Sequence, residues 1–122
     1  MTKISKKDKQ SLITKLEYEE YTVFKLLFES STDARSKAYL TSFTGYSERE
    51  LKNIIKKIRL KGLPVCSRVS NGGGYWIEWN KKEFGRFVAQ QKIEVEGYQK
   101  SLNNLIDIYK SLEGDDDNEL FI

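Results

Sequence analysis

Apolar residues recur along this chain with two different periods, and the clearest helical pattern lies between residues 47 and 61. Its apolar positions are three and four residues apart, which places them on one face of an α-helix: Leu51, Ile54, Ile55 and Ile58. Ser47 and Glu50 have the spacing of a capping box at a helix start. Gly62 and Pro64 are typical of a helix end. The pattern therefore predicts an amphipathic helix from Glu48 to just before Gly62.

The residues after this helix change to a pattern typical of β-strands. Val65–Val69 and Tyr75–Trp79 are short runs rich in β-branched and aromatic residues, and the segment 70–74 between them is rich in glycine. This predicts a β-hairpin with a glycine-rich tip. Two further helices are predicted upstream, at Leu16–Phe28 and Ser36–Phe43. The apolar face of the first would consist of Tyr21, Phe24, Leu27 and Phe28.

A longer helical pattern runs from Lys81 to about Leu112. Its main positions alternate in spacing between four and three, as in a heptad seam: Phe84, Val88, Gln91, Val95, Tyr98, Leu102, Leu105, Tyr109 and Leu112. A helix of about 30 residues is about 45 Å long, more than the small preceding domain can cover. We expect the seam to pair with a second copy of the chain, and folding back onto the first helix is the alternative. The expected dimer contacts are Val88, Val95, Tyr98, Leu102, Leu105, Tyr109 and Leu112.

Charge is distributed unevenly along the 122 residues. Residues 31–62 hold eight Lys or Arg against three Asp or Glu, whereas residues 93–122 hold two against eight. A basic middle and an acidic end predict a nucleic-acid surface in one part and a different contact in the other.

These patterns divide the chain into four parts. Residues 1–15 form a basic N-terminal arm, 16–80 the domain with the hairpin, 81–113 the long helix, and 114–122 an acidic tail. The expected fold class is mainly α with a small β-hairpin. The arm is expected to be mobile, and contact with DNA phosphates is its functional interpretation.

Two motifs close the central elements: Ile58–Gly62 (IRLKG) ends the amphipathic helix and Gly74–Ile77 (GYWI) ends the hairpin. They resemble the winged-helix DNA-binding domains of the biotin-repressor type, in which the recognition helix runs through Leu-Arg-x-x-Gly and the wing closes on Gly-Tyr-x-Leu. The chain is also similar to small helix-turn-helix proteins encoded by phages and prophages of Gram-positive bacteria. The resemblance covers about the first two-thirds of the chain. It implies a winged helix-turn-helix whose third helix enters the major groove.

The polar face of the amphipathic helix carries the candidate DNA contacts. Arg49 and Asn53 suit base readout, because Arg pairs with guanine and Asn with adenine. The lysines suit phosphates, which position a protein without specifying sequence. The complete candidate set is Tyr46, Ser47, Arg49, Lys52, Asn53, Lys56, Lys57, Arg68 and Asn71. A solvated, lysine-rich helix face without a ligand is the alternative.

No enzyme, metal site or cofactor is expected. The chain contains no histidine, the commonest general base and metal ligand. Its one cysteine, Cys66, is expected to be a buried, inert thiol. The glycines 72–74 match no phosphate-binding motif, and Asp115–Asp117 lack the register of a calcium loop. Neither a membrane span nor a leader pattern is present, so a cytoplasmic location is expected.

The expected function is sequence-specific binding of double-stranded DNA by a homodimer, as a transcription regulator or replication-origin accessory of a phage or mobile element. The acidic end with Phe121 is similar to the tails of bacterial single-stranded-DNA-binding proteins, which recruit replication partners, although those tails end on the phenylalanine itself. A solvated tail is the alternative. The second hypothesis is a protein-interaction module that recruits or inhibits a replication or host protein through its C-terminal helix and acidic tail.

Overall fold

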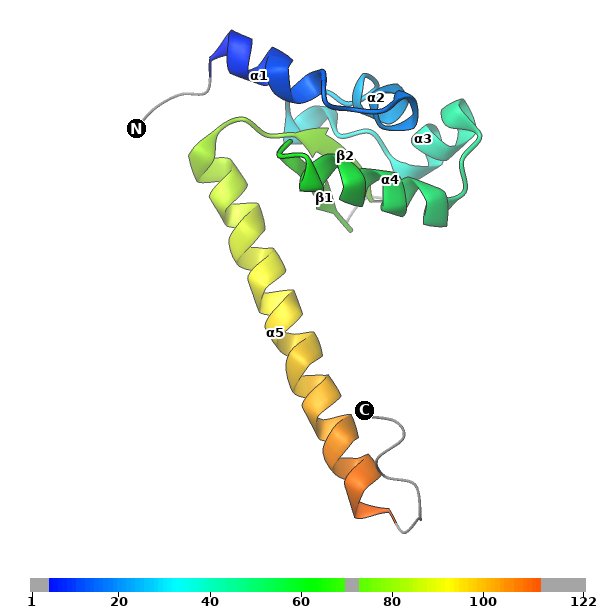
Figure 1. The fold of residues 1–122 in the computed structure, drawn as a ribbon, viewed down its shortest axis with the longest axis vertical. Helices are drawn as coiled ribbons and strands as arrows, with labels where there is room; N and C mark the ends of the chain where they lie inside the picture. The colour runs from blue at the N-terminus through cyan, green and yellow to red at the C-terminus, as the bar shows by residue number, and fades with distance from the viewer. Residues whose placement is uncertain (1–4, 70–72, 113–122) are drawn as a thin grey trace. The chain divides into compact units, whose positions relative to one another are not determined.

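The computed structural model describes residues 5–69 and 73–112. The chain divides into two compact units, Met1–Phe87 and Val88–Ile122. The elements, in chain order, are α1 (Lys6–Ile13), α2 (Tyr18–Phe24), the 3₁₀ helix η1 (Ser31–Asp33), α3 (Lys37–Thr44), α4 (Glu48–Leu60), β1 (Val65–Arg68), β2 (Gly74–Ile77) and α5 (Lys81–Ser111) (Figure 1). The expected fold class is confirmed, because the described residues are mainly α, with a small hairpin and a long C-terminal helix.

The core of the first unit lies between α2, α3, α4 and the hairpin. α4 packs against both α2 and α3. The apolar face predicted for this helix is the buried one, and it consists of Leu51, Ile54, Ile55 and Ile58. The other buried apolar side chains are Val23, Phe24, Leu27, Leu40, Leu63, Val65, Cys66, Tyr75 and Ile77. The spacing of the hydrophobic residues in α4 therefore determines which side of this helix faces the core.

Both ends of α4 are set by local chemistry. Ser47 Oγ accepts a hydrogen bond from the Glu50 N–H, and Glu50 Oε1 accepts one from the Ser47 N–H, each at 3.1 Å. This confirms the predicted capping box. Gly62 follows the helix with φ +96°, the left-handed conformation that glycine adopts without steric cost. A Cβ on Gly62 would lie 3.3 Å from Leu12 Cδ2, a close contact with the end of that side chain.

The hairpin is antiparallel and pairs Val65 with Ile77 and Cys66 with Trp76. β2 also pairs with a residue outside the hairpin, which the sequence did not indicate. Arg35 and Tyr75 exchange two backbone hydrogen bonds of 2.9 Å. Cys66 is fully buried, as expected, and burial raises the pKa of its thiol to about 12. The thiol therefore stays protonated in the folded protein at neutral pH.

Two boundary predictions differ from the structure. The helix predicted over Leu16–Phe28 is the shorter α2, which ends at Phe24. Phe24 and Leu27 are buried as expected, but Tyr21, within α2, and Phe28 are about half exposed. Phe28 leaves the predicted face because the helix ends at Phe24. The arm predicted over residues 1–15 contains a helix, since residues 6–13 form α1, and Leu12 packs against the core. The many lysines of residues 1–15 led to the prediction of an arm, and the short apolar face of α1 was missed.

A buried ion pair joins α2 to the end of α4. Glu20 is only 3% exposed, and its carboxylate accepts a hydrogen bond from Lys61 Nζ and another from the Glu17 N–H at 3.2 Å. Burial by itself raises the pKa of Glu20. The hydrogen bonds from Lys61 and Glu17 and the charges of Lys61 and Lys57 outweigh it, so the pKa lies below its ordinary value. Lys61 therefore stabilises the fold by pairing with a buried carboxylate at the edge of the core.

Replacing Lys61 by methionine is expected to lower the free energy of unfolding by about 1–3 kcal/mol at neutral pH, because a buried carboxylate loses its charged partner. A carboxyl group with a lowered folded-state pKa stabilises the fold above its ordinary pKa, and this contribution is lost as the pH falls through the folded-state value. The difference between variant and parent should thus shrink in acid. Urea unfolding at several pH values measures it, with Lys82→Met as an exposed control expected to stay within about 0.5 kcal/mol. Equal stability of the Lys61 variant and the parent would contradict the assignment.

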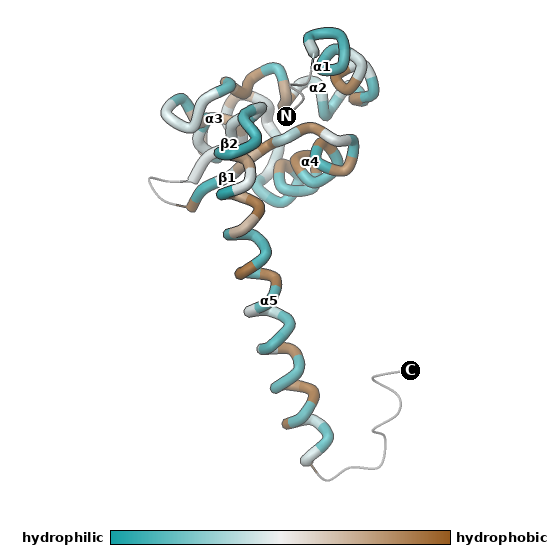
Figure 2. Tube along the Cα trace, turned by 90° about the vertical axis from the view of Figure 1, so that its left-hand side faces the viewer, coloured by the Kyte–Doolittle hydropathy of each residue, from teal (hydrophilic) through white to brown (hydrophobic). Residues whose placement is uncertain are grey.

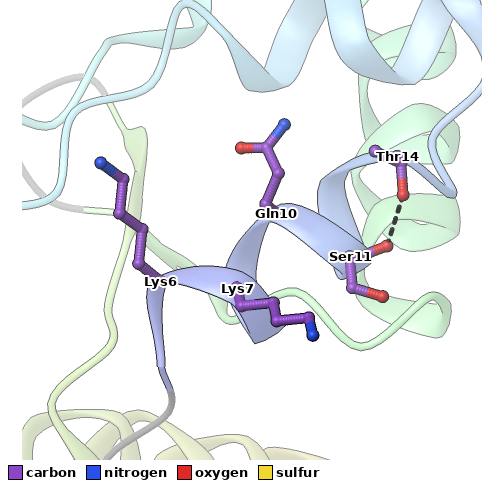
Figure 3. A pocket seen from close by; sticks show the side chains of 5 residues that line it. All are labelled: Lys6, Lys7, Gln10, Ser11 and Thr14. Atoms are coloured by element: carbon purple, nitrogen blue, oxygen red, sulfur yellow. Dashed lines mark hydrogen bonds between the residues drawn. The ribbon is translucent and has the colours of Figure 1, made fainter.

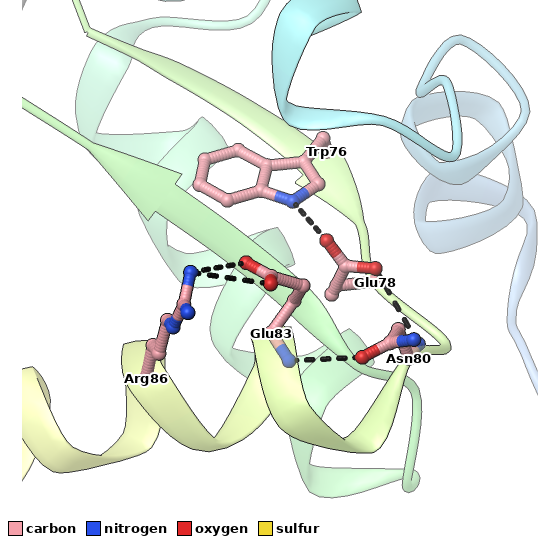
Figure 4. Close-up of polar contacts among 5 residues, drawn as sticks. All are labelled: Trp76, Glu78, Asn80, Glu83 and Arg86. Carbon is pink, nitrogen blue, oxygen red and sulfur yellow. Dashed lines mark hydrogen bonds and ion pairs between the residues drawn. The ribbon is translucent and has the colours of Figure 1, made fainter.

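Polar contacts fix the start of α5 next to β2 (Figure 4). Asn80 Oδ1 accepts a hydrogen bond from the Glu83 N–H at 3.0 Å and so caps the helix. Glu78 receives hydrogen bonds from Trp76 Nε1 at 3.3 Å and from the Asn80 N–H at 3.4 Å. Arg86 pairs with Glu83 one turn later. The first turns of α5 thus belong to the first unit, which ends at Phe87.

In the second unit, α5 continues to Ser111 and no other element is described. Hydrophobic residues recur at intervals along it (Figure 2). The exposed large ones are Val88, Ile93, Val95, Tyr98, Leu102, Leu105, Ile108 and Leu112. Within the described part of this unit nothing covers them. The predicted acidic tail, 114–122, lies outside the described residues.

Candidate nucleic-acid interface

The burial of one face of α4 turns its polar face to solvent. Arg49, Lys52, Asn53 and Lys56 are all exposed, and their spacing of three and four places them on one side of the helix. Glu50, which lies in the same first turn, is bound in the cap of the helix. The structure therefore brings these four predicted residues together as one basic, hydrogen-bonding surface, which we call the α4 face.

Lys57, the fifth predicted contact on this helix, is also exposed and lies four residues after Asn53, beside the α4 face. It lines a hollow of about 230 Å³ together with Glu17, Glu20, Leu60 and Lys61. Its charge helps to lower the pKa of Glu20. Lys57 therefore adjoins both these carboxylates and the α4 face, and its contact with DNA stays a prediction.

The two turn residues of the candidate set have structural roles. Ser47 Oγ is the acceptor of the cap, which leaves its hydroxyl hydrogen for a ligand. Tyr46 packs against the core. Its phenol pKa is raised, first by loss of solvent and then by nearby acidic groups that include Glu19 and Glu50. The surroundings of the Tyr46 hydroxyl are thus less favourable for a phosphate than those of the α4 face.

Arg68 and Asn71 are the candidate residues of the hairpin. Arg68 Nη1 donates a hydrogen bond of 3.1 Å to the Ser31 carbonyl, so the side chain ties β1 to η1. Its Nε is buried and makes no hydrogen bond in the described part of the chain. Asn71 lies outside the described residues.

Arg59 connects α4 to the hairpin. Its Nε donates to the Val65 carbonyl at 2.8 Å and its Nη2 to Ser67 Oγ at 3.2 Å. Its guanidinium lies 5.3 Å from the centre of the Phe87 ring, and burial lowers its pKa. The arginine of the IRLKG motif is therefore a structural residue.

A larger hollow of about 560 Å³ lies along α1 (Figure 3). Its described lining comes from that helix and the residue after it: Lys6, Lys7, Gln10, Ser11 and Thr14. Thr14 Oγ1 donates a hydrogen bond of 2.7 Å to the Ser11 carbonyl. The two lysines provide positive charge, but these residues do not include a carboxylate or thiol.

Two other kinds of site are absent from residues 5–69 and 73–112. These residues contain no group of three or more His, Cys, Asp or Glu placed to hold a metal ion. Among the same residues, no helix combines the length and hydrophobicity needed to cross a membrane.

Comparisons with protein-family models, with curated proteins and with solved structures returned no match. The function of the protein is therefore inferred from the chemistry of the α4 face.

Proposed function

We propose that the protein binds double-stranded DNA through the α4 face and the hairpin. The observation that carries the proposal is the exposure, on one side of a well-capped helix, of Arg49, Lys52, Asn53 and Lys56. The order α2, α3, α4, β1, β2 is that of a winged helix-turn-helix, in which the third helix enters the major groove and the hairpin forms the wing. An α-helix fits the width of that groove.

Within this proposal the residues have different roles. Lys52 and Lys56 contact phosphates, which dominate affinity and are indifferent to sequence. Arg49 and Asn53 read base edges, because each can form two hydrogen bonds with one base. The hairpin, with Arg68 and Asn71, follows the backbone next to the groove.

A titration of fluorescent duplex DNA at several salt concentrations tests the proposal. The logarithm of the affinity is expected to fall linearly with the logarithm of the salt concentration, with a slope of about −0.9 for each neutralised phosphate. Absence of binding at low salt, or binding that does not respond to salt, would contradict it.

We further propose that α5 pairs with α5 of a second copy. The support is the four-and-three spacing of its exposed residues, since an exposed heptad seam is complementary to itself. Leu102 and Leu105 lie in its most apolar stretch, with Ile106 and Ile108 on either side of the seam. A dimer would present two α4 faces to two half-sites of DNA.

Such a protein would act in the cytoplasm, without a cofactor, as a transcription regulator or replication-origin accessory. A phage or mobile element is the proposed source. Salt dependence does not separate these two roles. The DNA recovered with the protein from cells does, because a promoter-proximal operator and a replication origin differ in position.

Replacing Asn53 by alanine is expected to relax the preference for one base position more than it lowers overall affinity. A good bidentate contact discriminates against the wrong base by about 1–3 kcal/mol, whereas each phosphate contact contributes equally for all sequences. Selection from a randomised duplex library measures the preference, and Lys56→Ala is the matched control, expected to weaken all sequences alike. An unchanged preference in the Asn53 variant would move the readout to Arg49, to the hairpin or to DNA shape.

A further inference from the structure

A series of stacked groups lies at the start of α3, apart from the α4 face. The guanidinium carbon of Arg35 is 4.3 Å from the centre of the Phe28 ring and 4.2 Å from that of Tyr39. Tyr39 in turn stacks on Phe43, one helical turn further on, with ring centres 5.7 Å apart and planes inclined by 16°. We call Phe28, Arg35, Tyr39 and Phe43 the stacking series.

The two ends of this series, Phe28 and Phe43, are exposed to solvent. Phe43 is 64% exposed and Phe28 48%, whereas Phe24, four residues before Phe28, is 7% exposed and belongs to the core. Tyr39 packs partly against the core, and Arg35 donates a hydrogen bond of 3.2 Å from Nε to the Leu26 carbonyl. The series is thus anchored at its middle and open at Phe43.

The charge at the Phe43 end of the series favours an anionic ligand, while two carboxylates, Glu29 and Asp33, lie close to Phe28 and Arg35 in the sequence. The segment 34–47 contains two basic residues, Arg35 and Lys37, and no Asp or Glu. Lys37 lies close to the hairpin, since a Cβ on Gly73 would be 3.2 Å from its Cε. A flat aromatic ring with an open face beside fixed positive charge suits a nucleobase attached to its phosphate.

We propose that the stacking series binds unpaired nucleotides, with a base stacked on the exposed ring of Phe43 and the phosphates near Arg35 and Lys37. This is a second nucleic-acid site and differs in ligand from the α4 face. A base inside a duplex is already stacked on its neighbours, so the site takes single-stranded DNA or RNA. Its residues have no place in the duplex contact proposed for the α4 face.

The test uses the full chain and three probes of equal length: oligothymidylate, oligouridylate and an abasic DNA strand with the same phosphates. The parent is expected to bind at least one base-bearing strand more tightly than the abasic one, and the comparison of thymidylate with uridylate separates DNA from RNA. Phe43→Ala should weaken binding of the base-bearing strand roughly 5- to 150-fold, the range for one base–aromatic stack. The abasic strand should be unaffected, and Phe43→Trp should restore binding.

Tyr21→Ala is the matched control, because Tyr21 is also half exposed and lies 6.0 Å from the ammonium of Lys25. Its effect on all three strands should be small. Thermal unfolding followed by circular dichroism checks that both variants keep the fold. Equal affinity of the parent for base-bearing and abasic strands, or no loss in Phe43→Ala, overturns the proposal. Duplex affinity measured in parallel reports on the α4 face, so each site can fail without the other.

Discussion

Replacing Lys52 and Lys56 together by glutamate is expected to lower the affinity for duplex DNA on the order of 100-fold at moderate salt, for all sequences alike. Both side chains are exposed on the α4 face, one helical turn apart. The change removes two phosphate contacts and introduces repulsion. The slope of log affinity against log salt should therefore become shallower by about 2. Titrations of parent and variant at matched salt measure both quantities.

The control is Lys100→Glu with Lys110→Glu, which changes the net charge of the chain by the same amount. Both lysines are exposed on α5 and lie off the heptad seam. A general loss of positive charge would affect the two variants equally. If the control loses as much affinity as the α4 variant, binding is non-specific attraction, and the assignment of the α4 face is wrong.

Replacing Leu102 and Leu105 together by aspartate is expected to convert a dimer to a monomer. These side chains are about half exposed on α5 and occupy adjacent positions of the seam. Carboxylates in a paired seam would face each other without counter-charge, which a helix pair does not tolerate. Sedimentation equilibrium at micromolar concentration compares the two forms. Affinity for a duplex with two half-sites should fall by about 100- to 10,000-fold through loss of avidity.

The first unit, Met1–Phe87, should stay folded in this variant, because its buried core lies between Val23 and Ile77. The control is Ala89→Asp with Ile93→Asp. These two positions are exposed one turn apart on the side of α5 away from the seam. It should remain dimeric and keep its DNA affinity. A monomeric parent protein would contradict the pairing of α5 and support folding back onto the helix predicted over Leu16–Phe28, which is α2.

Local patterns determined much of this fold from the sequence alone. The period of Leu51, Ile54, Ile55 and Ile58 identified the buried face of α4, since a helix repeats every 3.6 residues whatever surrounds it. The capping box at Ser47 and the left-handed Gly62 marked its ends for the same reason, because caps act over one turn. The exposure of Arg49, Lys52, Asn53 and Lys56 followed from that face. The hairpin and α5 were found with errors of one or two residues at their ends.

Contacts between residues far apart in the chain were decided only by the tertiary structure. Nothing near Glu20 in sequence indicates that Lys61, 41 positions later, is its partner, or that Lys57 lines the same hollow as this carboxylate. The bridge of Arg35 to Tyr75 likewise joins residues that are distant in the sequence and depends on the tertiary structure. Periodicity reports which side of an element is buried, because that depends on neighbours in sequence. Which charged group meets which partner depends on packing in three dimensions.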